Sequence, residues 1–134
     1  MNKQHTLSIV LEVVAIFVTP LILAVETYYS SDFAAASSIV LAIISVSLFM
    51  LSLEAQKPSV ANLVPTAVFS ALGAAGRVAF APLAYVKPVS AVAIFAGAAL
   101  GRHAGFLVGA LSALLSNVFF GQGSWTPWQM YAWG

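Results

Sequence analysis

The last part of the chain, residues 104–134, contains no charged side chain. One straight helix over this run would measure about 46 Å at 1.5 Å per residue, whereas the hydrocarbon core of a bilayer is about 30 Å thick. The run must therefore turn, and the sequence GQGS followed by TP marks the place. Across the chain 61% of the residues are hydrophobic and 7% are charged, against roughly 25% charged in soluble domains. An integral membrane protein is predicted.

Apolar runs define the expected helices, because a spanning helix needs about 20 mainly apolar residues. The runs cover residues 7–25, 37–53, 61–84, 89–101 and 104–120, and another helix opens near residue 127. Pro20 is expected to bend the first helix, and Arg102 with His103 to form a turn between the fourth and fifth. Thr126 is expected to cap the last helix, with Pro127 at its first position. The predicted fold is all-α, a bundle of about five transmembrane helices plus the start of a sixth.

The tail after the GQGS turn is too short to cross a bilayer. A helix of two turns exposes unsatisfied carbonyls to lipid unless a partner covers them, so the chain is interpreted as a fragment or a shortened gene product. At the other end, a signal peptide is the alternative to a first spanning helix, because Lys3 precedes an apolar run. The length of that run, Glu12 within it and the second run that follows favour the spanning helix.

The placement of Lys and Arg predicts the orientation in the membrane, since cytoplasmic loops carry an excess of both. With the N-terminus in the cytoplasm, three cations fall on the inner side: Lys3, Lys57 and Arg102. Lys87 falls outside and is the one loop cation that disagrees. A multi-pass protein of the plasma membrane with a cytoplasmic N-terminus is predicted.

Arg77 is the residue that most needs an explanation. It lies in the third apolar run, about 10 Å from the predicted outer end of that helix, and an arginine in hydrocarbon costs at least about 2.5 kcal/mol. One interpretation is structural: the side chain reaches the outer headgroups or caps carbonyls of a neighbouring helix. The other is functional: it contacts a ligand in an outward-facing cavity. The sequence leaves both open.

Further candidate binding residues lie on the same predicted side of the membrane. They are Tyr85, Lys87, Asn117, Gln122, Trp125, Trp128 and Gln129. Each has a structural alternative, because tryptophan and tyrosine collect at membrane interfaces and Asn117 can bond a neighbouring helix. Aromatic walls with a few polar groups are also typical of small-molecule sites. Convergence of these residues on Arg77 would favour binding, whereas an Arg77 facing headgroups or backbone would favour a scaffold.

Small residues recur at four-residue spacing on the third, fourth and fifth predicted helices, which lets helices approach closely. The glycines are Gly97, Gly101, Gly105 and Gly109. They are predicted to form helix-packing faces on a hairpin. The alanines are Ala67, Ala71, Ala75 and Ala79. They are predicted to pack within the bundle or to dock on a separate membrane subunit.

Several functions are excluded by what the sequence lacks. There is no cysteine, so no disulfide or Cys-based metal site is possible. The two histidines, His5 and His103, lie far apart without a carboxylate or second histidine one turn away, so no catalytic group, metal site or cofactor is predicted. No phosphate-binding loop is present, so the chain cannot itself hydrolyse ATP by the Walker mechanism. Scattered cations with a net charge of +1 argue against nucleic acid as a partner.

Four segments carry a resemblance to a known family. They are GRVAFAP (76–82), VKPV (86–89), GFLVGALSALLSN (105–117) and FGQGSWTPWQMYAWG (120–134). The stretch 57–134 resembles the substrate-binding S components of energy-coupling factor (ECF) vitamin transporters, and the nearest subgroup looks like the cobalamin type. Residues 1–56 look like an added N-terminal helix pair with a cytoplasmic linker, and 57–134 like a partial S-component domain.

The resemblance implies a six-helix membrane bundle that binds a vitamin in an outward-facing pocket closed by extracellular loops. It implies as partners a transmembrane coupling protein and two ATPases. The family's docking face would fall on Ala67, Ala71 and Ala75, and its loops on 85–88 and 122–129. Part of the six-helix core would be missing from this chain. The alternatives are a small membrane scaffold or assembly protein, or a truncated fragment without function. An ion-coupled carrier would need carboxylates along a pathway within the membrane. Only Glu12 lies even partly within a predicted span.

Overall fold

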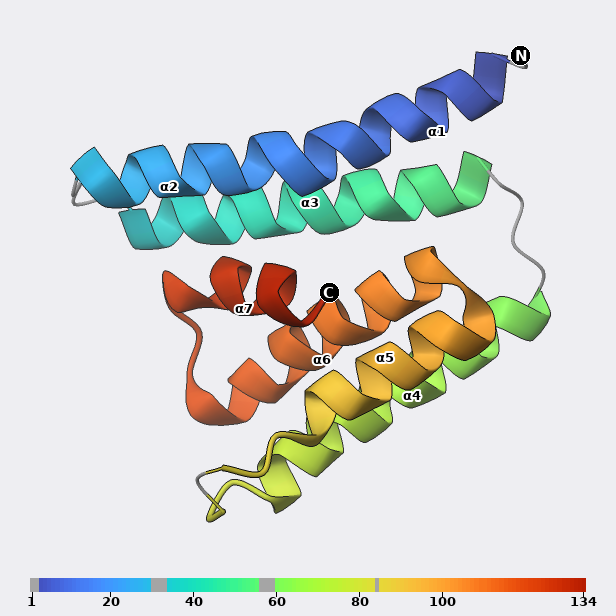
Figure 1. Cartoon of the computed structure of the whole chain (residues 1–134). Coiled ribbons are helices and arrows are strands. Elements are labelled where there is room, and N and C mark those ends of the chain that lie inside the picture. Colours follow the sequence, from blue (N-terminus) through green and yellow to red (C-terminus); the bar gives the residue numbers. More distant parts are fainter. Residues whose placement is uncertain (1–2, 30–33, 56–59, 84) are drawn as a thin grey trace. The chain divides into compact units, whose positions relative to one another are not determined.

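Every regular element in the described part of the chain is a helix (Figure 1). The computed structural model describes residues 3–29, 34–55, 60–83 and 85–134. The elements in chain order are α1 (Lys3–Val13), the π-helical turn η1 (Val14–Val18), α2 (Thr19–Tyr29), α3 (Ala34–Ala55), α4 (Val60–Ala79), α5 (Pro88–Leu100), α6 (Arg102–Phe120) and α7 (Trp125–Trp133). Because α1, η1 and α2 follow one another directly, they correspond to the first predicted helix. The prediction of an all-α fold is confirmed.

Contacts divide the chain into two compact units. One holds α1, η1, α2 and α3 with Gly123–Trp128, and the other holds α4, α5 and α6 with Gln129–Gly134. The two halves of α7 therefore belong to different units. The predicted domain division after residue 56 remains a prediction.

In the first unit, α1, η1 and α2 form one continuous rod, and α3 runs antiparallel beside it (Figure 1). Pro20 is the second residue of α2, and it lacks the N–H that a helical residue donates one turn back. The π-helical turn Val14–Val18 ends directly before this segment. Thr19 follows the turn, and its Oγ1 donates to the Val14 carbonyl at 3.4 Å. The disturbance expected at Pro20 thus takes the form of a local π-helical turn, a common feature of interrupted helices.

In the second unit, α4, α5 and α6 pack against one another in all three pairings. Ala93 and Ala96 of α5 and Val108 of α6 form a buried core cluster, with Phe69 of α4 packed against it. Phe69 also meets Phe95 edge to face, with ring centroids 5.7 Å apart. Small side chains at the centre let the three helices come close.

The four predicted packing glycines have different roles. Gly105 and Gly97 face each other, and a Cβ on Gly105 would lie 2.6 Å from the Gly97 Cα. Gly109 lies against the backbone of Trp133, where a Cβ would overlap the carbonyl. Gly101 differs from the prediction, because nothing lies within 4 Å of a Cβ built there. It joins α5 to α6 at φ 96° and ψ 165°, a conformation that is essentially restricted to glycine.

Two helix boundaries differ from the predicted ones, and single residues explain both differences. The turn between α5 and α6 is Gly101 alone, so Arg102 and His103 are the first residues of α6 rather than the turn itself. Helix α4 ends at Ala79 rather than at residue 84, because Pro82 disfavours helical backbone in the residue before it. Arg77 consequently lies in the last turn of α4.

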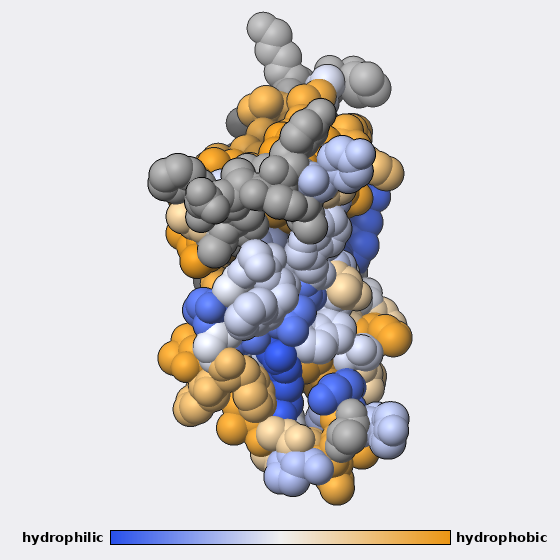
Figure 2. Space-filling model, turned by 90° about the vertical axis from the view of Figure 1, so that its left-hand side faces the viewer, coloured by the Kyte–Doolittle hydropathy of each residue, from blue (hydrophilic) through white to orange (hydrophobic). Residues whose placement is uncertain are grey.

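Apolar side chains cover much of the exposed surface. Ile94 on α5 and Phe119 on α6 are 73% and 74% exposed, and Figure 2 shows hydrophobic residues at both margins of the face it draws, on either side of a hydrophilic band. Among the described residues, α6 is the one helix both long and apolar enough to cross a membrane, and α5 is apolar but shorter. Large exposed apolar patches mark surfaces that contact lipid or another protein.

Candidate functional site

The strongest candidate site is built around the guanidinium group of Arg77. Its Nη1 donates to Ser116 Oγ at 2.7 Å and to Asn117 Oδ1 at 2.6 Å, both on α6. Its Nη2 lies 3.5 Å from Oε1 of Gln129 on α7, a long and weak bond. All three acceptors are side-chain atoms, so Arg77 links three helices through side chains rather than by capping a helix end.

The acceptors are themselves joined, and two aromatic rings lie against the guanidinium group. Asn117 Nδ2 donates to Gln129 Oε1 at 2.9 Å, which fixes the amide of Asn117 between its two partners. The guanidinium carbon lies 4.8 Å from the ring centroid of Phe120 and 4.7 Å from that of Trp133. Both distances are within the range of cation–π attraction. We call these six residues the Arg77 cluster: Arg77, Ser116, Asn117, Phe120, Gln129 and Trp133.

A chain of buried hydroxyl groups runs from Ser116 of the Arg77 cluster to α4. Ser116 Oγ donates to the Ser112 carbonyl at 2.6 Å, and Ser112 Oγ donates across to the Ser70 carbonyl of α4 at 3.0 Å. Ser70 Oγ in turn donates to the Thr66 carbonyl at 2.8 Å. The Ser112 hydroxyl lies against Gly73, where a Cβ would overlap it. The bond from Ser112 to Ser70 joins α6 to α4. It thereby helps to hold Arg77 of α4 beside Ser116 of α6.

The cluster carries a positive charge with no acid in the same unit. No Asp or Glu follows Glu54 in the sequence, so α4, α5, α6 and Gln129–Gly134 contain none. The compensation for Arg77 inside this unit therefore comes from dipoles and rings and not from an ion pair. In the described part of the chain, no buried side-chain nitrogen or oxygen lacks a hydrogen-bond partner.

The structure brings three of the predicted binding residues together and leaves three of the others apart. Arg77, Asn117 and Gln129 meet in the cluster. Tyr85 and Lys87 lie exposed on the link that precedes α5, with Tyr85 99% exposed. Gln122 is exposed, and its Nε2 donates to the Leu114 carbonyl at 3.0 Å. No described hydrogen bond ties these three to Arg77.

The two remaining predicted residues, Trp125 and Trp128, lie in the first half of α7 and are 51% and 38% exposed. They belong to the unit that does not contain Arg77. Helix α7 begins at Trp125, so Pro127 is its third residue rather than its first. Thr126 Oγ1 accepts a hydrogen bond from the Gly123 amide at 3.3 Å. That bond orders the turn before α7 and replaces the predicted cap.

Three members of the cluster were not among the predicted binding residues: Ser116, Phe120 and Trp133. A helical signal was present for each. Ser116 and Phe120 lie one turn apart on α6 and flank Asn117, and Trp133 lies one turn after Gln129. Residues three or four apart share a helix face, so extending Asn117 and Gln129 by one turn would have found Phe120 and Trp133, and Ser116 directly precedes Asn117.

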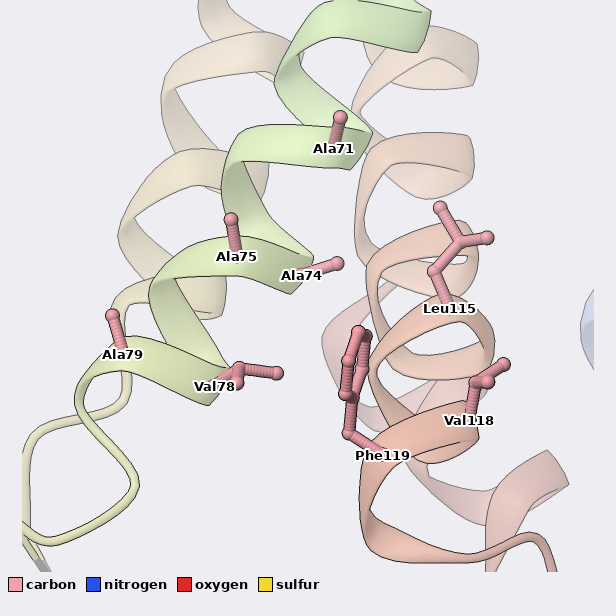
Figure 3. Close-up of a pocket in the computed structure, with 8 residues that line it drawn as sticks. All are labelled: Ala71, Ala74, Ala75, Val78, Ala79, Leu115, Val118 and Phe119. Atoms are coloured by element: carbon pink, nitrogen blue, oxygen red, sulfur yellow. The ribbon is translucent and has the colours of Figure 1, made fainter.

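An apolar groove lies between α4 and α6, outside the Arg77 cluster. It is open, has a volume of about 610 Å³ and is lined only by apolar residues (Figure 3). Val78 and Phe119 point into it, and Ala71 and Ala75 lie along its α4 side. Ala67, Ala71 and Ala75, the predicted docking residues, are all exposed.

The second unit is all-helical, exposes many large apolar side chains and joins polar side chains of three helices around Arg77. Residues 57–133 match the family described as ECF-type riboflavin transporter, S component. Because the match covers more than half of the chain, the protein belongs to this family. No curated protein and no solved structure matches the chain significantly.

Membership establishes the coarse function. The chain is a membrane-embedded, substrate-binding subunit of a vitamin transporter, and the family is one of transporter subunits and not of enzymes. The predicted S-component family is confirmed. The cobalamin-type subgroup is not confirmed, and the orientation of the N-terminus stays a prediction.

Proposed function

We propose that this chain binds a vitamin-type molecule through its 57–134 domain, from the extracellular side, for uptake into the cell. The observation that carries the proposal is the meeting of Arg77, Asn117 and Gln129 from three helices. A binding site needs a few placed polar groups beside aromatic walls, and Phe120 and Trp133 supply the walls. The contacts of Arg77 are with side chains of other helices, and they differ from the headgroup or backbone contacts that the scaffold alternative predicts.

Riboflavin is the first ligand to test, because the matching family is described by that vitamin. Its flat ring system suits stacking on aromatic side chains, and its ring carbonyls suit amide and guanidinium donors. Cobalamin is the second ligand. Five further ligand contacts are proposed: Tyr85, Lys87 and Gln122 from loops, and Trp125 and Trp128 from α7.

Transport requires a partner, since the chain has no nucleotide-binding loop. We infer that a transmembrane coupling protein with its ATPases docks on the exposed alanines Ala67, Ala71 and Ala75. Small exposed side chains let a second helix approach closely, which supports this assignment. The proposed topology is multi-pass in the plasma membrane with the N-terminus in the cytoplasm.

The test is a titration of the purified chain in detergent with riboflavin, followed by quenching of flavin fluorescence. Saturable quenching at about one flavin per chain is expected. Cobalamin is titrated in parallel by calorimetry, and biotin serves as an unrelated vitamin. Absence of saturable binding for riboflavin and cobalamin alike would overturn the proposal and favour a helix-packing scaffold or a fragment without function.

A further inference from the structure

No acidic side chain of its own unit pairs with the positive charge of Arg77. The unit contains no Asp or Glu, although it carries Lys87 and Arg102 in addition to Arg77. A cation held away from water is costly unless it is both hydrogen-bonded and paired. Hydrogen bonds and rings meet the first need at Arg77. No Asp or Glu side chain of the unit meets the second need.

The donors of Arg77 are only partly used. A guanidinium has five N–H donors in a fixed plane. The two N–H groups of Nη1 donate to Ser116 and Asn117, and Nη2 makes one long bond to Gln129. One N–H of Nη2 and the Nε–H have no partner among the described residues. Since no buried side-chain nitrogen there lacks a partner, Nε keeps accessible surface.

On one edge of a guanidinium, Nε–H and one N–H of Nη2 point in parallel and form the fork that holds two oxygens of a carboxylate or phosphate. At Arg77, Nε–H has no partner among the described residues, and Nη2 makes one long bond. The edge that includes Nη1 is closed by Ser116 and Asn117. The cluster thus holds the arginine from one side and leaves its oxyanion-binding edge available.

We propose that the Nε–Nη2 edge of Arg77 binds an oxyanion, a phosphate or carboxylate group that supplies the missing negative charge. This inference rests on the proposed function when the oxyanion belongs to the transported ligand, and it then narrows the substrate class to anionic vitamins or vitamin phosphates. The same chemistry is present in a phospholipid headgroup, so the experiment separates the two sources.

The ligand arm compares riboflavin with riboflavin 5′-phosphate, which share one ring system and differ by the phosphate. Wild-type chain is expected to bind the phosphate at least about tenfold more tightly, the scale of a charge-assisted bidentate bond. Gln129→Glu places a carboxylate beside Nη2 and keeps the acceptor that Asn117 and Arg77 use. This internal counter-charge is expected to reduce the preference to within about twofold.

Two controls accompany the ligand arm. Asn62→Asp adds the same charge at an exposed site on α4, fifteen residues and so about 22 Å along the helix from Arg77, and is expected to retain the preference. Circular dichroism and gel filtration show whether each variant keeps its helices and its size. Because Gln129→Glu is isosteric and adds an ion-pair partner, it is expected to be at least as stable as wild type.

The lipid arm measures phospholipid retained by the purified chain, using native mass spectrometry of wild type and Gln129→Glu. If wild type prefers the phosphate and Gln129→Glu loses that preference, the oxyanion belongs to the ligand. Equal binding of both flavins, with one phospholipid retained by wild type and lost from the variant, assigns it to lipid. If wild type shows neither the phosphate preference nor the retained phospholipid, the inference is overturned. Riboflavin binding without either effect leaves the proposed function standing, whereas absence of all flavin binding removes that function too.

Discussion

Arg77 was identified from sequence because a charge in an apolar run is expensive, but the sequence left open whether it serves structure or binding. Its partners lie 39, 40 and 52 residues further along the chain. Contacts at such separations depend on how three helices pack, which no local pattern encodes. Asn117 and Gln129 were nevertheless predictable as candidates, because polar amides are rare in an uncharged stretch. Lys87 and Tyr85 were predicted because they lie on the same predicted side of the membrane as Arg77, and the structure leaves them exposed on a loop.

Asn117 is expected to be the most sensitive polar residue of the cluster after Arg77. It is fully buried, accepts from Arg77 and donates to Gln129. Asn117→Ala leaves one N–H of Arg77 Nη1 without its partner and leaves Gln129 Oε1 with only the long bond from Arg77 Nη2. An unsatisfied buried group costs about 1–3 kcal/mol of unfolding free energy. Thermal unfolding in detergent should show a clearly lower midpoint. Gln122→Ala, which removes an exposed bond to a carbonyl, should change the midpoint little. Equal shifts for the two variants would contradict the account.

The positions of the helices follow from the apolar runs, because each described helix lies largely within one of the predicted runs. Their ends do not follow as well, since ends depend on single residues. Pro82 stops α4 before the predicted residue, and Gly101 alone makes the turn that was assigned to Arg102 and His103. The glycine spacing predicted close packing of α5 on α6. It did not distinguish Gly105, which packs, from Gly101, which turns.

The α5–α6 contact gives an asymmetric prediction. A Cβ on Gly105 would lie 2.6 Å from the Gly97 Cα, whereas a Cβ on Gly97 would lie 3.6 Å from the Gly105 Cα. Gly105→Ala therefore forces the two backbones apart and is expected to cost about 1–3 kcal/mol. Gly97→Ala fits at ordinary contact distance and gains about 1 kcal/mol of helix propensity. Melting curves of the two variants should move in opposite directions. Equal destabilisation would show that the contact is not as close as described.

For the whole molecule, composition predicted a membrane protein, and the family match supports that prediction. The segments at 76–134 carried the family resemblance because they combine rare residues in a fixed order. The identity of the ligand lies beyond such reasoning, because closely related sites differ by a few side chains whose contacts depend on packing. The alanine spacing predicted a docking face, and the three alanines are exposed on α4.

Docking through that face has a direct test. Ala71→Leu adds bulk at the centre of the exposed alanines and is expected to reduce recovery of the coupling protein in a pull-down about fivefold or more. Riboflavin binding should persist, since Ala71 lies outside the Arg77 cluster. Ser90→Leu adds similar bulk to an exposed position on α5 and should leave recovery unchanged. Full recovery with Ala71→Leu would place the docking face elsewhere.

The central claim is that the Arg77 cluster binds the transported molecule, and riboflavin titration of two arginine variants tests it most directly. Arg77→Ala removes the guanidinium that Ser116, Asn117 and Gln129 hold. Arg102→Ala removes the same charge from an exposed residue in the first turn of α6. The account predicts at least about tenfold weaker binding for Arg77→Ala and binding within about twofold of wild type for Arg102→Ala. Equal affinities in the two variants, both correctly folded, would contradict it.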